Sequence, residues 1–224
     1  MSQLEPLGRS GPGRPSGGSE QKRAAIRTAA LHLFERDGFA RTSMDAIAAA
    51  AGVSKRTIYN HYADKETLFL SVVRDTYGAL VEAVMAIMDR YLTDLADAAD
   101  VERGFASFAR DFAVLVSRSS DRPPLIRLMM AEASHFPQLQ ADQMRPRGIT
   151  AALAERLAKL AARGLLDLPD AEDAANHLFA LTMGQVNNRS MFGTVLPPED
   201  EIVRMATSGV AAFLRAYRPG AFSG

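Results

Sequence analysis

Apolar residues recur three and four positions apart in one segment after another, which is the spacing of an amphipathic helix. One such stripe runs from about residue 19, where Ser19 is a candidate cap, to residue 37, and a longer one runs from Asp64 to about Leu92. Gly38 follows the first stripe and predicts its end. Further helices are expected near residues 100–118, 123–134, 137–163, 170–191 and 199–216, with a kink or break at Pro146. Ala, Leu and Arg also outnumber β-branched residues, so the sequence predicts an all-α fold.

Two shorter apolar faces, joined by a glycine turn, lie between the first two stripes. Gly52 supplies the left-handed backbone that ends a helix, and Ser54 is a good N-cap for the next helix. The face before the turn consists of Met44, Ile47, Ala48 and Ala51. After the turn, Ile58 and Tyr62 lie four residues apart and are expected to face inward. The sequence therefore predicts two short helices packed through these faces.

The second short helix is left with an outward face made almost entirely of hydrogen-bond donors. Its members are Lys55, Arg56, Thr57, Tyr59, Asn60 and His61. A short helix that exposes donors and cations beside a glycine turn is what a helix-turn-helix places in the major groove of DNA. The alternative is an ordinary helical hairpin whose polar residues are merely solvated.

The stretch from Thr42 to Lys65 resembles the DNA-binding domain of TetR-family transcriptional regulators. The family pattern runs roughly T-[TS]-x-x-x-I-A-x-x-A-G-[VS]-S-x-x-x-[IL]-Y-x-H-[FY]-x-x-K. This sequence matches it at Thr42, Ser43, Ile47, Ala48, Ala51, Gly52, Val53, Ser54, Ile58, Tyr59, His61, Tyr62 and Lys65. The resemblance implies a DNA-binding head, a long fourth helix that joins it to a regulatory body, and no catalytic activity.

From the donor face and the resemblance together we expect two kinds of DNA contact. Candidates for reading base edges are Lys55, Arg56, Thr57 and Asn60. Candidates for phosphate contacts are Thr42, Tyr59, His61 and Lys65, and Ser43, Ser54 and Tyr62 complete the candidate set within the motif. Thr42 and Ser43 compete for the N-cap of the first short helix, and Thr42 with Asp45 fits a capping box.

Residues 1–18 are rich in Gly, Pro and Ser, and we expect a disordered basic arm there. Within it, Gly13-Arg14-Pro15 resembles the short elements that lay an arginine into the minor groove, so Arg14 is a further DNA-binding candidate; a stray arginine in a flexible leader is the equal alternative. The expected domains are this arm, a helix-turn-helix domain at residues 19–66, and an effector-binding and dimerisation domain at residues 67–224.

The overall charge is zero, but its distribution is uneven. Residues 1–65 hold ten Lys or Arg against six Asp or Glu, whereas residues 66–224 hold sixteen against twenty. The first part therefore carries +4 and the remainder −4. Local charge decides whether phosphate is attracted, so a basic head on an acidic body fits a DNA-binding module.

Aromatic and methionine residues in the second region could line an apolar cavity for a lipophilic effector, although core packing is the simpler explanation for each residue. The candidates are Phe105, Phe108, Phe112, Met129, His135, Phe179, Met183 and Asn187. We interpret the last two helices as a dimer surface with a broad apolar stripe, the alternative being that they close the core of one chain. This stripe consists of Ile202, Met205, Ala206, Val210, Phe213, Leu214 and Tyr217.

The sequence lacks the motifs of an enzyme. There are no cysteines, and no zinc-protease, phosphate-loop, nucleophile-elbow or dinucleotide motif occurs; Glu132 and His135 have di-iron spacing, but no second such pair exists. We therefore expect no cofactor and no metal. No uncharged run is long enough to span a membrane, so we expect a cytoplasmic protein. The resemblance implies a homodimer that binds palindromic double-stranded DNA and a small effector. The rival hypotheses are a helical enzyme or ligand-binding protein with a vestigial head, and a protein-interaction module.

Overall fold

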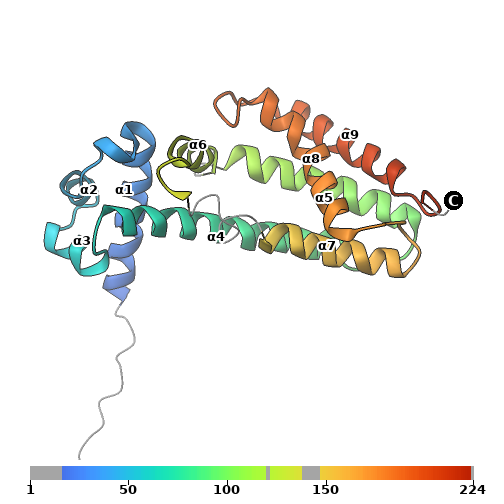
Figure 1. The fold of residues 1–224 in the computed structure, drawn as a ribbon, viewed down its shortest axis with the longest axis horizontal. Helices are drawn as coiled ribbons and strands as arrows, with labels where there is room; N and C mark the ends of the chain where they lie inside the picture. Colours follow the sequence, from blue (N-terminus) through green and yellow to red (C-terminus); the bar gives the residue numbers. More distant parts are fainter. Residues whose placement is uncertain (1–16, 120–121, 138–146, 223–224) are drawn as a thin grey trace, which may run out of the picture. The chain divides into compact units, whose positions relative to one another are not determined.

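The structure, a computed structural model, describes residues 17–119, 122–137 and 147–222. Within these ranges every regular element is an α-helix, and the all-α prediction is confirmed (Figure 1). The helices are α1 (Gly17–Arg41), α2 (Met44–Ala50), α3 (Lys55–His61), α4 (Lys65–Tyr91), α5 (Ala98–Arg118), α6 (Arg122–Glu132), α7 (Arg147–Ala162), α8 (Ala171–Arg189) and α9 (Glu199–Ala216). The chain divides into two compact units, Met1–Val72 and Val73–Gly224, and the boundary in the sequence falls within α4.

The first unit is built around three aromatic rings from α1 and the start of α4. Phe34 lies 5.3 Å from Phe69 in an edge-to-face arrangement, and Phe39 lies 5.2 Å from Phe69. Gly38 interrupts α1 with a left-handed backbone (φ 78°), as the sequence predicts, and this break allows Phe39 to turn back onto the other two rings. Ile47 of α2 and Ile58 of α3 are fully buried in the same unit.

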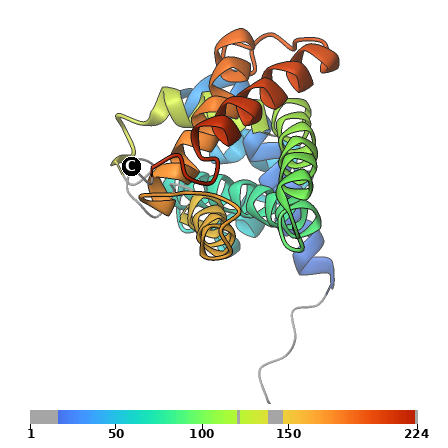
Figure 2. The ribbon, with the colours of Figure 1, turned by 90° about the vertical axis from the view of Figure 1, so that its right-hand side faces the viewer.

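The second unit has one apolar core, to which α4, α5, α7, α8 and α9 all contribute. Helices α5, α8 and α9 lie side by side in both views of the ribbon (Figures 1 and 2). Phe105 of α5 stacks on Phe213 of α9 at 6.0 Å, and Phe112 of α5 lies 6.0 Å from Phe179 of α8. Since buried aromatic rings contribute large apolar areas, these pairs hold the three helices together.

Helices α8 and α9 cross at a glycine. A Cβ added at Gly209 of α9 would lie 2.0 Å from the carbonyl oxygen of Leu181 in α8, well inside van der Waals contact. Only glycine lets the two backbones approach this closely. Gly184, three residues further along α8, has open space where a Cβ would stand.

Helix boundaries agree closely with the sequence prediction except near α7 and at both ends of α1, which continues past the break at Gly38 to Arg41. The helix expected over 137–163 begins at Arg147 in the structure, and Pro146, where the break was expected, lies outside the described residues. Helix α1 already begins at Gly17, so Ser19 lies inside its first turn and is not its cap. The described helices are all too short or too polar to cross a membrane.

Replacing Gly209 with alanine should destabilise the protein because the new methyl group forces α8 and α9 apart. We expect a loss of about 1–3 kcal/mol in the free energy of unfolding, measured by urea denaturation. Gly184→Ala is the matched control, and it should be neutral or stabilising by up to about 1 kcal/mol since the position is open. Equal stability of the two variants would contradict the close crossing.

Candidate nucleic-acid interface

The first short helix, α2, is fixed by a serine cap and by its apolar face. Ser43 is the N-cap, and its hydroxyl accepts a hydrogen bond from the backbone N–H of Ala46 at 3.1 Å. Met44, Ile47 and Ala48 are buried, in agreement with the predicted face. A serine N-cap satisfies one of the free N–H groups of the first turn, so the start of α2 is defined.

The turn and the second short helix, α3, follow the sequence prediction closely. Gly52 adopts a left-handed backbone (φ 65°), and the N–H of Val53 donates back to the carbonyl of Ala48 at 3.0 Å. Ser54 then caps α3 by accepting from the N–H of Thr57 at 3.1 Å. Ile58 is fully buried and anchors α3 to the unit.

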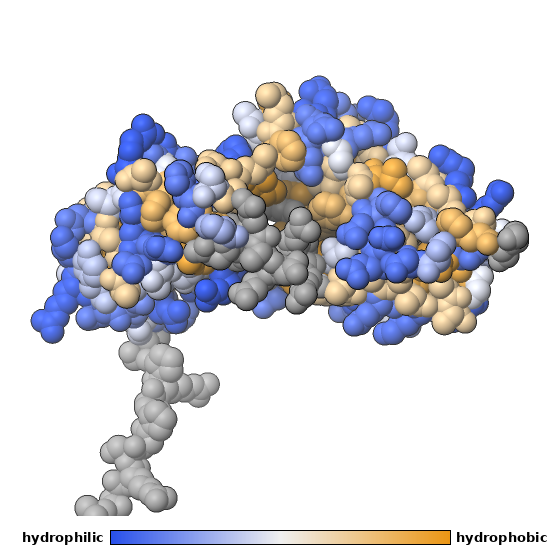
Figure 3. Space-filling model, in the orientation of Figure 1, coloured by the Kyte–Doolittle hydropathy of each residue, from blue (hydrophilic) through white to orange (hydrophobic). Residues whose placement is uncertain are grey.

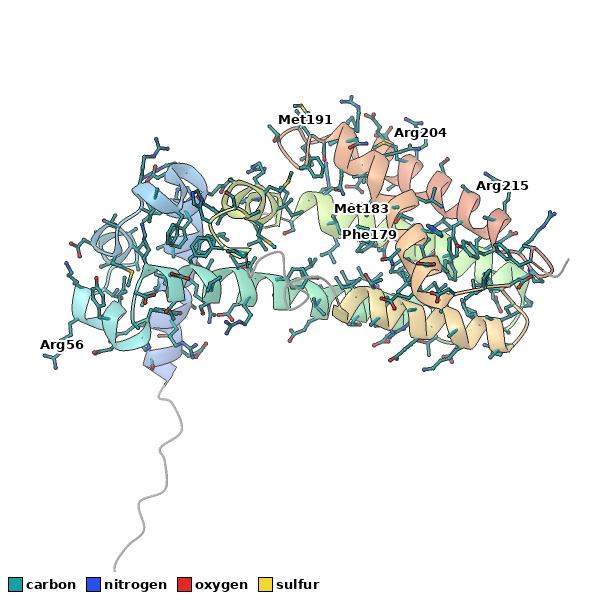
Figure 4. All side chains as sticks on the ribbon, viewed as in Figure 1. Arg56, Phe179, Met183, Met191, Arg204 and Arg215 are labelled. Atoms are coloured by element: carbon teal, nitrogen blue, oxygen red, sulfur yellow. The ribbon has the colours of Figure 1, made fainter. Side chains whose placement is uncertain are left out.

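The outward face of α3 presents donors to solvent. Arg56 points away from the ribbon in Figure 4, and no described residue forms an ion pair with it. Tyr59 is 47% exposed and Asn60 is also exposed. Thr57 and His61 are half-buried, and the Thr57 hydroxyl lies 2.8 Å from that of Ser54. The drawn face of the first unit is mixed, with hydrophilic residues beside a few hydrophobic ones (Figure 3).

An open hollow of about 440 Å³ lies beside α3 in the first unit. It is lined by Ala40, Arg41, Thr42, Ser43, Met44, Asp45, Lys55, Tyr59 and Lys65. Three of these residues are cations and one is a carboxylate, so the lining carries a net charge of +2. A basic hollow beside an exposed donor helix is suited to a phosphate group.

Arg41 belongs to this hollow but was absent from the candidates predicted from the sequence. It is exposed, and its Nε donates to the carbonyl oxygen of Asp37 at 2.8 Å. A basic residue two positions before the Ser43 cap of α2 is a signal that the motif comparison alone does not contain.

Two candidates from the sequence face inward. The hydroxyl of Thr42 is buried and donates to the carbonyl oxygens of Leu33 (3.2 Å) and Gly38 (2.8 Å), so it closes the α1–α2 corner and is not presented to a phosphate. The capping-box prediction for Thr42 is also corrected, since Ser43 is the cap.

Tyr62 is 4% exposed, and its hydroxyl has no hydrogen-bond partner among the described residues. Its ring therefore packs the core and is not available as a DNA contact. Arg14 lies outside the described residues.

Lys65 is held by the backbone of the same unit. Its ammonium donates to the carbonyl oxygens of Phe39 (2.7 Å), Thr42 (2.9 Å) and Ala40 (3.3 Å). It also lies 4.3 Å from the centroid of the Phe39 ring. An ammonium group has three protons, and each has a carbonyl acceptor here. Lys65 can therefore add charge to the hollow, while its hydrogen bonds stabilise the corner between α1 and α2.

The aromatic effector candidates in the second unit are part of its core. Phe105, Phe108 and Phe112 are at most 2% exposed, and Met183 is 1% exposed. Figure 4 labels Phe179 and Met183, which both extend from α8; Phe179 is partly buried against the core. Core packing is sufficient to explain why these residues are apolar, and no ligand is needed for it. Their contact with an effector stays a prediction.

The remaining effector candidates have separate surroundings. Met129 is half-buried, and His135 is largely exposed, with its Nδ1 3.1 Å from a carboxylate oxygen of Glu132. Asn187 borders a crevice of about 10 Å³ between α5, α6 and the loop after α8. That volume holds about one water molecule, so this crevice is too small for an organic effector.

The apolar stripe of α9 faces the core of its own chain, which corrects its interpretation as a dimer surface. Six of its residues are at most 7% exposed: Ile202, Met205, Ala206, Val210, Phe213 and Tyr217. Leu214 is half-buried and borders a groove between α5 and α9. A partner chain can meet α9 only through its other faces.

Within the described residues, no group of three or more His, Asp or Glu side chains is placed to hold a metal ion. The features that remain are a capped pair of short helices, an exposed donor face and a basic hollow. Together they define a helix-turn-helix protein with a separate helical unit.

Comparison with known proteins identifies the family. Residues 26–72 match the model of the bacterial regulatory proteins of the tetR family, and residues 103–219 match the C-terminal domain of AefR-like transcriptional repressors. The second match alone covers more than half of the chain. The protein belongs to the TetR family of transcriptional regulators, and its relatives are regulators rather than enzymes.

Individual relatives agree with this assignment. A TetR-family regulator from Mesorhizobium loti has 33% identity and a TM-score of 0.79, covering 91% of this chain and all of that one. The flavonoid-responsive regulator FrrA has 29% identity and a TM-score of 0.66, with coverage of 89% and 98%. The regulator RutR of Escherichia coli is 30% identical over 126 residues, which are 56% of this chain and 48% of RutR. FasR of Mycolicibacterium smegmatis matches over 38% of its own length, so the alignments span less than half of these two curated relatives.

Replacing Lys65 with methionine should destabilise the first unit because three backbone carbonyls lose a charged donor. We expect a loss of about 1–3 kcal/mol in the free energy of unfolding, with faster amide hydrogen exchange at the α1–α2 corner. Lys55→Met is the matched control, since its ion pair is exposed and contributes little to stability. A Lys65→Met variant as stable as the control would show that the three hydrogen bonds do not stabilise the corner.

Proposed function

We propose that this regulator is a ligand-responsive repressor that binds a palindromic operator as a homodimer and is released by a small lipophilic effector. The observation that carries the proposal is the outward face of α3, where Arg56, Tyr59 and Asn60 are exposed. Solvent-facing donors on the second helix of a helix-turn-helix are suited to base edges in the major groove.

The proposal assigns different contacts to α3 and to the hollow. Arg56, Thr57 and Asn60 are the base-reading candidates on α3, while Tyr59 and His61 position the helix on the phosphates. Lys55, which the sequence suggested as a base reader, lines the hollow, and it is assigned to phosphate here. In the hollow, Arg41 and Ser43 take the phosphate role that the buried Thr42 hydroxyl does not fill, and Lys65 adds charge. The +4 charge of residues 1–65 supports this arrangement because phosphate contacts supply much of DNA affinity.

A homodimer would supply the two recognition helices that a palindrome requires, about 34–36 Å apart. The exposed apolar side chains of α8 and its following loop support a partner at this end of the second unit. Met191 (63% exposed; labelled in Figure 4) and Leu196 (58%) are the most exposed of them; Phe192 and Val195 lie between these two in sequence, and Leu181 lies further back on α8. Exposed apolar clusters of this kind are typical of protein interfaces.

Effector control is supported by the family and by the aromatic content of the second unit. FrrA, at 29% identity, is named as flavonoid-responsive, and an aromatic effector would be compatible with walls formed by Phe and Met side chains. Release requires that the effector bind the DNA-free conformation more tightly than the DNA-bound one. A saturating effector that left operator affinity unchanged would contradict this mechanism.

Footprinting on the DNA that flanks the gene of this protein, at two salt concentrations, tests the proposal. We expect a protected palindrome whose affinity falls steeply with salt, since counterions are released when phosphates are neutralised. If no site appears there, selection from random sequences follows. Failure of that selection, together with tight binding of a lipophilic ligand, would instead support a ligand-binding protein with a vestigial head.

Arg56→Ala should weaken operator binding because a base-reading arginine contributes about 1–3 kcal/mol, which is roughly a five- to 150-fold change in Kd. Binding to random DNA should change much less. Arg204→Ala, which removes an exposed arginine from α9 (Figure 4), is the matched control and should leave operator affinity unchanged. Equal losses on operator and random DNA would move Arg56 from the base-reading set to the phosphate set.

A further inference from the structure

An ion pair joins the two helices of the helix-turn-helix. The Lys55 ammonium at the start of α3 lies 2.8 Å and 2.9 Å from the two carboxylate oxygens of Asp45 in the first turn of α2. Both side chains are exposed, at 61% and 63%. The hydrogen bond from Lys55 to Asp45 raises the pKa of the lysine, so the Lys55 ammonium is charged at neutral pH.

Asp45 is also the only carboxylate among the residues that line the basic hollow. It stands where the proposed function requires a phosphate, and it pairs with Lys55, the cation that α3 contributes to the lining of the hollow. Arg41 donates through its Nε to a backbone carbonyl, and Lys65 donates to three. Of the three cations that line the hollow, Lys55 is therefore the one that bonds to a side-chain carboxylate, whereas the hydrogen bonds described for the other two go to backbone carbonyls.

We propose that Asp45 limits the affinity of this protein for DNA by competing with phosphate for the Lys55 ammonium. This inference rests on the proposed function, and it assigns to Asp45 a role that opposes binding. An exposed ion pair is weak, so phosphate can displace the carboxylate. The displacement nevertheless leaves an unpaired negative charge beside the DNA backbone, which disfavours the complex.

The charge balance gives the expected size of the effect. While the pair is intact, Lys55 and Asp45 together present no net charge to DNA, and the pair releases no counterion. Without the carboxylate, Lys55 neutralises one more phosphate in each head, and the slope of log affinity against log salt steepens by about 0.9 per head. Limiting affinity in this way would keep the operator complex weak enough for an effector to dissociate it.

The experiment measures the binding of full-length protein to its selected operator and to random DNA over a series of salt concentrations. We expect Asp45→Asn to bind both DNAs about three- to tenfold more tightly at low salt, with a steeper salt slope in each case. Because the Asp45 side chain is exposed, the thermal unfolding of the Asp45→Asn variant should match that of the unsubstituted protein.

Two further variants establish that Asp45 acts through Lys55. In the Lys55→Met background, Asp45→Asn should give no gain in affinity, since the cation that it releases is absent. Glu20→Gln removes the same charge from α1, where Glu20 lies 3.7 Å from Arg23 and 3.9 Å from Arg27 and is not part of the hollow. This control should change affinity by less than about twofold at moderate salt.

Unchanged or weaker DNA binding by Asp45→Asn would overturn the inference. An equal gain in the Lys55→Met background would also overturn it, because Asp45 would then act by direct repulsion of phosphate. Absence of salt-dependent DNA binding by the unsubstituted protein would overturn the proposed function, and the inference with it.

Discussion

The corner between α1 and α2 is the constraint on which the DNA-binding head depends. Gly38 breaks α1. The ammonium of Lys65 at the start of α4 donates hydrogen bonds to the backbone carbonyls of Phe39, Ala40 and Thr42, which follow this break. The Thr42 hydroxyl closes the same corner from inside. Because α2 begins immediately after it, the direction of α2, and through the glycine turn that of α3, follows from these hydrogen bonds.

The sequence was sufficient to predict most of the helices, the glycine turn and the Ser54 cap, because each depends on local chemistry; it left the cap of α2 open between Thr42 and Ser43. Gly52 in a left-handed conformation and Ser54 at the N-cap are properties of a few neighbouring residues. The roles of Thr42 and Lys65 could not be predicted in the same way. The acceptors of Lys65 are backbone carbonyls up to 26 residues away, which it reaches only when α1 and α4 are brought together. The Thr42 hydroxyl bonds to carbonyls of α1 four and nine residues before it, and the sequence pattern does not decide between these bonds and an N-cap role.

The stripe of α9 illustrates a different limit. Its period shows that Ile202, Val210 and Phe213 share one face of a helix, and that this face is buried. Periodicity does not state whether a second chain or the same chain covers the face. Here Phe105 of α5 stacks on Phe213, so the chain covers the stripe itself. The exposed large apolar residues that precede α9 in the sequence lie on α8 and on the loop after it.

The contact between Gly209 and the backbone of Leu181 has a consequence for motion within the second unit. Sliding of one helix past another needs side chains that can change rotamer as the surfaces move. At this crossing backbone faces backbone, with no side chain between them to rearrange. Helices α8 and α9 should therefore move as a single rigid lever, and any change that a ligand induces has to be absorbed by the elements packed around that lever.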